Sequence, residues 1–135
     1  MYAVDIGGVT SERHVVRVFD AKSGEHLMDI GKRGSGPGEF NLPRDIAIGV
    51  DGRLYVVDGG NFRVVVFDRD GKYLFAFGSV GKQYGQFARP KEVAVDRQGN
   101  VWVTDATALG SGPEPPGLGH AIYKFSPQGE LLLTL

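Results

Sequence analysis

A repeat of 47 residues constrains the fold of this 135-residue chain more than any other feature of its sequence. Gly-Glu-Phe at 38–40 returns as Gly-Gln-Phe at 85–87, and Tyr-Val-Val-Asp at 55–58 returns as Trp-Val-Thr-Asp at 102–105. Short apolar runs and the turns between them, which contain Gly and Asp, recur at this same spacing. A period of this length predicts a supersecondary unit that buries its faces only against its neighbours.

The clearest copy of the unit runs over residues 43–77. Short runs rich in Val, Ile, Tyr and Phe predict strands at 45–50, 54–58, 63–68 and 73–77. Turn signals such as Asp51-Gly52 and Asp70-Gly71 separate these runs. Four antiparallel strands in sequence order make a meander, which is the blade of a β-propeller. We name the strands of a blade a to d, from the inside outwards.

The flanking residues follow the same order. Residues 90–135 predict strands at 92–96, 101–105, 121–125 and 131–135, whereas residues 2–30 predict strands only at 2–5, 14–19 and 26–30. The first blade therefore lacks its inner strand a. We expect an all-β chain of about eleven strands and no helix, arranged as one partial propeller with blades at 2–30, 43–77 and 90–135.

The motifs resemble those of the NHL-repeat family of β-propellers. The resemblance is carried by Gly-Glu-Phe-x-x-Pro-Arg-Asp-Ile-Ala-Ile at 38–48, by Gly-Arg-Leu-Tyr-Val-Val-Asp at 52–58 and by their copies at 85–95 and 99–105. The family usually closes with six blades, so the resemblance implies that about half of a ring is present. Either the chain is a piece of a larger protein, or it pairs with a second copy or another half to complete the ring.

Topology divides the loops of such a blade between two faces. The a–b and c–d turns are short and lie on one face, while the b–c loops and the d-to-a crossovers lie on the other. The second group varies in length, and variable loops on a rigid scaffold are frequent binding sites. We therefore expect the functional site on this face, which we call the crossover face.

Charged residues at the crossovers and at the starts of the inner strands are the candidate ligand-binding residues. Positive charge exceeds negative charge among them, although the net charge of the whole chain is −1. Such a cluster favours an acidic ligand. The candidates are Lys32, Arg33, Arg44, Asp45, Lys82, Arg89, Lys91, Glu92 and His120.

Several of these positions have two interpretations. Asp45 and Glu92 are equivalent in the repeat; they could hold Ca²⁺ at the pore entrance, or they could pair with Arg44 and Lys91. Asp5, Asp58 and Asp105 end the three b strands; they could form a carboxylate ring, although we favour acceptance of backbone N–H groups in their own b–c turns. The aromatic residues Phe40 and Phe87 recur at the repeat spacing and are expected to wedge between blades.

Two further features are weaker signals. The Gly/Pro-rich segment 106–120 is a recognition loop or a tolerated insertion. The three histidines His14, His26 and His120 could contribute to a metal site, but they fall in different blades or at different depths. We therefore interpret them as scattered, exposed or half-buried histidines and predict no metal ligand.

The function expected from these residues is a binding or scaffold module that presents its loops to a protein, a peptide or another ligand. No catalytic residue is identified and no cofactor is expected. One alternative is part of a metal-dependent enzyme, because residues 119–135 resemble propellers related to the peptidylglycine-amidating lyases. Those enzymes use inner-strand histidines, where this chain has Asp45 and Glu92. A second alternative is RNA binding, although we do not expect nucleic acid as the partner.

Composition excludes little else. The chain has no cysteine, so it has neither disulfides nor thiolate metal sites. It has no apolar run long enough to span a bilayer, so we expect no membrane partner. The compartment stays open, with an extracytoplasmic parent protein as one alternative.

Overall fold

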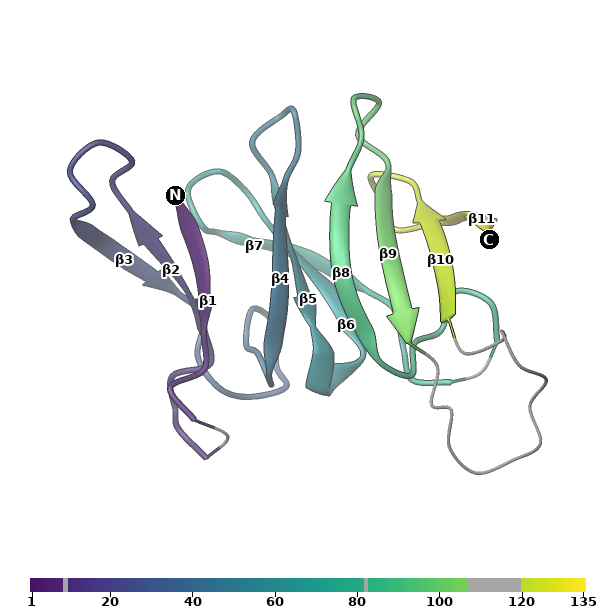
Figure 1. Cartoon of the computed structure of the whole chain (residues 1–135), viewed down its shortest axis with the longest axis horizontal. Helices are drawn as coiled ribbons and strands as arrows, with labels where there is room; N and C mark the ends of the chain where they lie inside the picture. The colour runs from purple at the N-terminus through teal and green to yellow at the C-terminus, as the bar shows by residue number, and fades with distance from the viewer. Residues whose placement is uncertain (9, 82, 107–119) are drawn as a thin grey trace.

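The computed structural model describes residues 1–8, 10–81, 83–106 and 120–135. They form three antiparallel sheets that lie side by side (Figure 1). Sheet one contains β1 (Tyr2–Asp5), β2 (Val15–Phe19) and β3 (His26–Ile30). Sheet two contains β4 (Pro43–Ile48), β5 (Leu54–Asp58), β6 (Arg63–Phe67) and β7 (Tyr73–Phe77). Sheet three contains β8 (Pro90–Val95), β9 (Val101–Ala106), β10 (His120–Phe125) and β11 (Leu131–Thr134).

The predicted all-β propeller architecture is confirmed. Neighbouring strands of each sheet follow one another in the chain, so each sheet is a meander, and sheet one has three strands where the other two have four. The described residues contain one short 3₁₀ helix, η1 (Gly59–Asn61), between β5 and β6. No helix of the described part is long and apolar enough to cross a membrane.

The inner strands begin earlier than the sequence predicts. β4 starts at Pro43 and β8 at Pro90, and in both the register shifts before the acidic residue that follows, Asp45 or Glu92. Proline has no N–H for the ladder, and it is therefore tolerated at the first residue of a strand. The apolar alternation on which the prediction relied starts only after this irregularity.

Two apolar clusters join the sheets. Between sheets one and two, the fully buried residues are Val16, Phe40, Val56 and Val65, with Ile30, Leu54 and Phe67 almost fully buried. Between sheets two and three, they are Val57, Val64, Val66, Phe87, Val101 and Val103, with Tyr55, Val93, Tyr123 and Phe125 beside them. Each face of sheet two is therefore covered by a neighbour, as expected for a central blade.

Phe40 and Phe87 anchor these clusters from the crossovers, as the repeat predicts. Both are fully buried, and Phe87 packs against Tyr123 and Phe125 with ring centroids 6.0 and 5.9 Å away. Gly78 has a φ of 103°, and a Cβ there would collide with the Phe87 ring. Glycine at this position therefore lets the crossover close over the aromatic wedge.

Two residues that the sequence predicts to lie in the core are found elsewhere. The predicted core consists of Ile46, Ile48, Val57, Val64, Val66, Phe67, Val93, Val95, Trp102 and Phe125. Ile48 is 54% exposed, and Trp102 is only half-buried on the face of sheet three that points away from sheet two. The Trp102 Nε1–H donates to Asp96 Oδ2 at 3.0 Å, and Lys124 Nζ lies 5.1 Å from the ring centroid. The alternation of side chains along β9 places Trp102 on one face of the strand. No described residue of another sheet covers that face.

Candidate functional site

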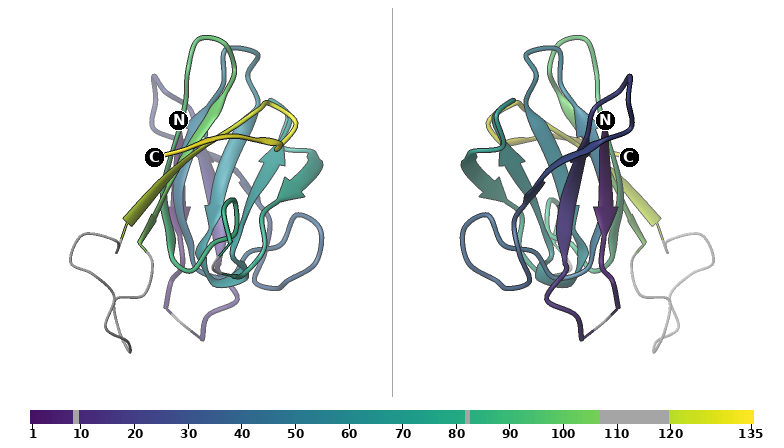
Figure 2. Two further views of the ribbon diagram at one scale, coloured as in Figure 1. Left: turned by 90° about the vertical axis from the view of Figure 1, so that its right-hand side faces the viewer. Right: turned by 90° about the vertical axis from the view of Figure 1, so that its left-hand side faces the viewer.

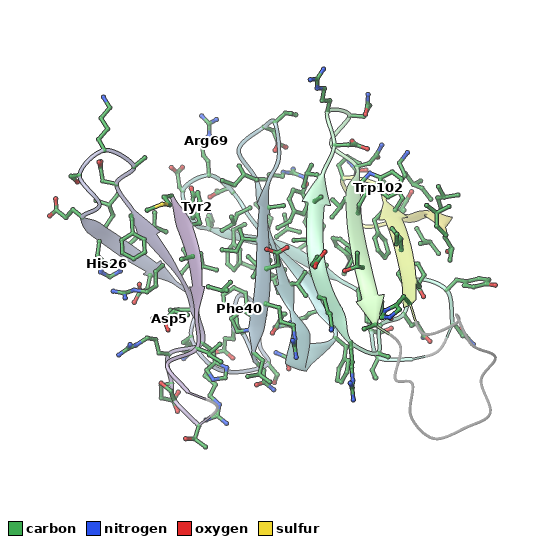
Figure 3. All side chains as sticks on the ribbon, viewed as in Figure 1. Tyr2, Asp5, His26, Phe40, Arg69 and Trp102 are labelled. Atoms are coloured by element: carbon green, nitrogen blue, oxygen red, sulfur yellow. The ribbon has the colours of Figure 1, made fainter. Side chains whose placement is uncertain are left out.

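The crossover face is assembled at one end of the sheets. The a–b turns lie at the opposite end from the crossovers 31–42 and 78–89 (Figure 2). Arg69, in the turn between β6 and β7, projects from that opposite end, whereas Asp5 lies at the crossover end (Figure 3). The division of the loops therefore follows the topology predicted from the repeat.

The two crossovers share one backbone conformation. Gly34 N donates to Phe40 O at 2.8 Å, and Gly81 N donates to Phe87 O at 3.1 Å, which is the same bond one repeat later. Side-chain bonds repeat as well, because Gly36 N donates to Glu39 Oε1 at 3.0 Å and Gln83 N donates to Gln86 Oε1 at 3.1 Å. The crossovers are therefore defined loops that hold their side chains in fixed places.

A buried ion pair locks the first crossover to sheet two. Arg63 Nε donates to Asp58 Oδ2 at 2.9 Å. The same guanidinium donates to Ser35 O at 3.2 Å and to Gly36 O and Glu39 O at 2.9 Å. Asp58 is fully buried. Sequence reasoning did not identify Arg63, because the crossover carbonyls that it binds lie 24–28 residues away in the chain.

The Asp58 carboxylate is surrounded by donors. Asn41 N donates to its Oδ1 at 2.7 Å, and Asn61 Nδ2 donates to its Oδ2 at 2.8 Å. Burial raises the pKa of Asp58 above its ordinary value, and the hydrogen bonds from Asn61, Asn41 and Arg63 offset that rise only in part. Arg63 is therefore the positive charge that makes the buried carboxylate tolerable at neutral pH.

The strand-ending aspartates accept N–H groups, but not all from the place predicted. Asp105 Oδ1 accepts from Arg89 N at 2.7 Å, and Asp58 accepts from Asn41, so both bind the crossover that precedes their sheet. Among the described residues, only Asp5 accepts a backbone N–H of its own turn, at Gly7 N, whereas Asp58 accepts only the Asn61 side chain from its own turn. The expectation of backbone capping in the local turn therefore holds for Asp5 and fails for Asp58, and most of the turn after Asp105 lies outside the described residues.

Asp45 and Glu92 have different environments despite their equivalence. Asp45 Oδ2 accepts Val93 N–H at 3.0 Å, which ties the inner strand of sheet two to that of sheet three. Glu92 is exposed, and its side chain has no hydrogen bond or ion pair among the described residues. Neither carboxylate forms the ion pairs with Arg44 and Lys91 that were one alternative.

The basic candidates surround this framework on its solvent side. Lys32 pairs with Glu39 at 3.4 Å. Arg44, Arg89 and Lys91 are exposed and Arg33 is half-buried, and none of these four makes an ion pair with a described residue. Lys82 lies outside the described residues, and His120 is exposed at the start of β10.

His14 has a structural role that the sequence did not reveal. It is fully buried, its Nδ1 accepts Leu42 N–H at 2.9 Å, and its Nε2 lies 3.1 Å from Gly8 O. These two contacts require a neutral ring with the proton on Nε2. Across the part of the chain that is described, no group of three His, Asp or Glu side chains is placed to hold a metal ion.

A shallow hollow opens at the crossover end between sheets one and two. Its volume is about 290 Å³, and Ile6, Leu42, Pro43 and Arg44 line it. Apolar walls with one exposed guanidinium are suited to a chain that carries both apolar and acidic groups.

Family models match two parts of the chain. Residues 40–67 match the NHL repeat, and residues 9–52 match a domain described as a 6-bladed beta-propeller.

Two curated relatives share short stretches with the chain. Mouse (Mus musculus) NHL repeat-containing protein 3 is 37% identical over 73 residues, which are 52% of this chain and 19% of the relative. The human (Homo sapiens) E3 ubiquitin-protein ligase TRIM32 is 44% identical over 43 residues, which are 32% of this chain and 7% of the relative. The chain therefore spans less than a fifth of the length of either relative.

Solved structures show the same fold. A luciferin-regenerating enzyme superposes with a TM-score of 0.60 at 19% sequence identity, covering 90% of this chain and 36% of that structure. Identity at this level indicates the architecture and carries no activity across.

Proposed function

We propose that this chain, which consists of NHL-type β-propeller blades, is a binding module whose crossover face holds an acidic segment of a protein or peptide. Residues 2–30, 43–77 and 90–135 act as three blades of one partial propeller domain. They keep the crossovers in place while Arg33, Arg44, Arg89 and Lys91 contact the ligand.

The observation that supports this proposal most directly is the contrast between fixed backbone and unpaired charge. Asp58 and Asp105 fix the two crossovers through bonds of 2.7 Å to Asn41 N and Arg89 N. Arg44 and Arg89, in or beside these anchored segments, are exposed without an ion-pair partner among the described residues. Pre-organised cations bind an anion with less loss of side-chain and loop entropy.

The opposite face is a natural internal control. Its turns contain Arg69 and Arg97, which are also exposed. Aspartates accompany them in the same turns, at positions 68 and 70 beside Arg69 and at position 96 beside Arg97. We therefore expect acidic ligands to distinguish the two ends of the molecule.

The test is fluorescence anisotropy with a short labelled peptide rich in Glu and Asp, compared with its Gln/Asn counterpart. Charge reversal at Arg44 and Arg89 should weaken binding of the acidic peptide at least tenfold, while reversal at Arg69 and Arg97 should leave it unchanged. Equal effects of the two pairs would refute the site. Tighter binding of a single-stranded RNA of similar charge, lost with the same variants, would favour the RNA-binding alternative instead.

A partner that completes the ring is a separate part of the proposal. The outer face of sheet three exposes Ile122 and Leu133, which are 40% and 43% exposed. Light scattering on the eluting protein should give a mass near twice 14.6 kDa if a second copy covers this face. A mass of 14.6 kDa at all concentrations would exclude the second copy as the partner.

A further inference from the structure

A second hollow, lined by polar groups, opens beside the crossover that leads from β3 to β4 (Figure 1). Its volume is about 180 Å³, and it shares no residue with the apolar hollow at the start of β4. The residues that line it come from the crossover and from η1, and they are Arg33, Gly34, Ser35, Asn41 and Asn61. Such a lining is suited to a charged or hydrogen-bonding end of a ligand.

The backbone holds the walls of this polar hollow in place. Arg63 Nη1 donates to Ser35 O at 3.2 Å, and Gly60 N donates to Asn41 O at 2.7 Å. A Cβ at Gly60 would lie 2.7 Å from Asn41 Cγ, so glycine at this position lets the Asn41 amide lie against η1. Fixed walls lower the entropy that is lost when a ligand binds.

Asn61 gives the polar hollow an acceptor of fixed orientation. Its Nδ2 donates both of its hydrogens, to Gly34 O at 2.9 Å and to Asp58 Oδ2 at 2.8 Å. Both partners are acceptors, so the amide cannot be turned around, and Oδ1 has no hydrogen-bond partner among the described residues. Every buried side-chain nitrogen or oxygen in the described part of the chain is hydrogen-bonded. Asn61 Oδ1 is therefore open to solvent.

Arg33 gives the same hollow an unneutralised positive charge. It is half-buried, and its guanidinium forms no hydrogen bond or ion pair with any described residue. The charged side chains nearest to it in the crossover are already paired, since Lys32 lies 3.4 Å from Glu39. Arg63, on the adjoining strand, is paired with Asp58. A free guanidinium binds a carboxylate through two parallel N–H bonds, so this end of the hollow favours a carboxylate.

The crossover scaffold does not require these polar side chains. One repeat later, Val80 takes the place of Arg33 and Ala88 takes the place of Asn41. Val80 nevertheless forms the same isolated bridge as Arg33. The side-chain amide of Asn41 also has no hydrogen bond within the described ranges. Folding of the crossover therefore leaves Arg33 and Asn41 unexplained, whereas a bound ligand would use both.

We propose that the polar hollow captures the C-terminal carboxylate of the bound protein or peptide. The Arg33 guanidinium, the Ser35 hydroxyl and the Asn41 amide donate to the carboxylate. The N–H of the last residue donates to Asn61 Oδ1. This inference rests on the proposed function and deepens it, because it names the end of the acidic segment that is held.

The acceptor on Asn61 selects among anions. A phosphate in the hollow would bring only further acceptors to Asn61 Oδ1 and would leave it unpaired, which is unfavourable. The carboxylate of an Asp or Glu side chain lies further from the nearest N–H of its own chain than a C-terminal carboxylate does. A C-terminal residue therefore matches the guanidinium and the acceptor together.

The first test uses small probes and NMR on the full chain. N-acetylglycine carries both the carboxylate and the N–H, N-acetylglycinamide lacks the carboxylate, and inorganic phosphate lacks the N–H. We expect N-acetylglycine to shift the side-chain NH₂ signals of Asn41 and Asn61 in a saturable way, with at least about tenfold higher affinity than the other two, because hydrogen bonds to charged groups are strong. No shift, or equal binding of phosphate, would overturn the proposal.

The second test compares two labelled acidic peptides by fluorescence anisotropy. One ends in a free acid, and the other ends in an amide and has one additional Asp, so that their net charges are equal. The free acid should bind the parent chain at least about tenfold more tightly. Arg33→Val combined with Asn41→Ala should remove this difference. These are the residues present one repeat later, so circular dichroism should show an unchanged fold.

Charge reversal at Arg44 and Arg89 separates this inference from the proposed function. It should weaken both peptides by the same factor and preserve their ratio. Equal affinity of the two peptides for the parent chain would overturn the C-terminal site and leave the proposed function intact. A preference for the free acid that persists while reversal has no effect would refute the proposed function and support the hollow. Binding of neither peptide would overturn both.

Discussion

Replacing Arg63 by Met should destabilise the chain by about 3–5 kcal/mol at pH 7, the usual cost of removing one partner of a buried ion pair. Met keeps much of the apolar volume of the Arg side chain and removes its donors. Asp58 is fully buried and would keep only neutral donors. Three crossover carbonyls, of Ser35, Gly36 and Glu39, would lose their shared donor as well.

The pH dependence of this variant follows from the same geometry. Burial already raises the pKa of Asp58, and the Arg63 charge and its hydrogen bond are among the effects that hold it down. Without Arg63 the folded-state pKa rises further above the unfolded value. A raised carboxyl pKa gives stability that is fully present below the unfolded pKa and is lost as pH rises through the folded pKa. The loss of stability caused by Arg63→Met should therefore shrink as the pH falls from 7 toward 3.8, the ordinary pKa of an aspartate.

Urea unfolding followed by circular dichroism measures both effects, with Trp102, the one tryptophan, as a second probe. Asp58→Asn combined with Arg63→Met should recover part of the loss, because no buried charge remains. Arg53→Met is the matched control. Arg53 pairs with Asp51 at 3.5 Å on the surface, where 56% of the Asp51 side chain is exposed, so we expect less than about 1 kcal/mol. This explanation of the Asp58–Arg63 ion pair would be refuted if Arg63→Met lowered the free energy of unfolding by less than about 1 kcal/mol. It would also be refuted if the loss of stability grew as the pH fell.

Three further predictions concern the packing of Phe87 and the hydrogen bonds of Trp102 and Asp45. Phe87→Ala should lower the free energy of unfolding, measured with urea, by about 3–5 kcal/mol because Phe87 is fully buried. Trp102→Ala should lower it clearly less. Equal losses would contradict the assignment of Phe87 as the aromatic wedge. Trp102→Phe removes the largest of the effects that lower the pKa of Asp96, so a carboxyl NMR titration should show that pKa rising toward 3.8. A lowered carboxyl pKa gives stability that is lost as the pH falls through that pKa. Trp102→Phe should therefore lose less stability in acid than the parent chain. An unchanged Asp96 titration would exclude the hydrogen bond between Trp102 Nε1 and Asp96. Asp45→Ala should cost about 1 kcal/mol and speed amide exchange at Val93, whereas Glu92→Ala should do neither.

The strands and the aromatic wedges could be predicted from the sequence because their signals are local. Phe40 and Phe87 recur at the repeat spacing, and the alternation in β5 and β9 shows which side chains share a face. Whether a face is buried depends on the neighbouring sheet. The same repeat position holds buried Tyr55 in sheet two and half-buried Trp102 in sheet three, so the sequence places Trp102 in a strand correctly but cannot show that its face lacks a covering sheet.

The polar framework of the crossover face could not be predicted in the same way. His14 reaches Leu42 across 28 residues, and Arg63 reaches Gly36 across 27. Neither pair repeats elsewhere among the described residues. In sheet three, Ala121 lies opposite Asp105, where Arg63 lies opposite Asp58 in sheet two. A contact that occurs once, between distant segments, has no periodic signal to reveal it.

The strand-ending aspartates show how far a repeated residue keeps one role. Asp58 binds a crossover, Arg63 and the Asn61 side chain of its own turn, Asp105 binds a crossover, and Asp5 binds its own turn. The residue type and the strand position are shared, whereas the segment that lies beside the carboxylate on the inner side differs. With a preceding crossover, the carboxylate bonds its N–H groups; without one, it turns back on its own loop. The role of such a residue therefore depends on the contact between two segments, and not on its own position in the strand alone.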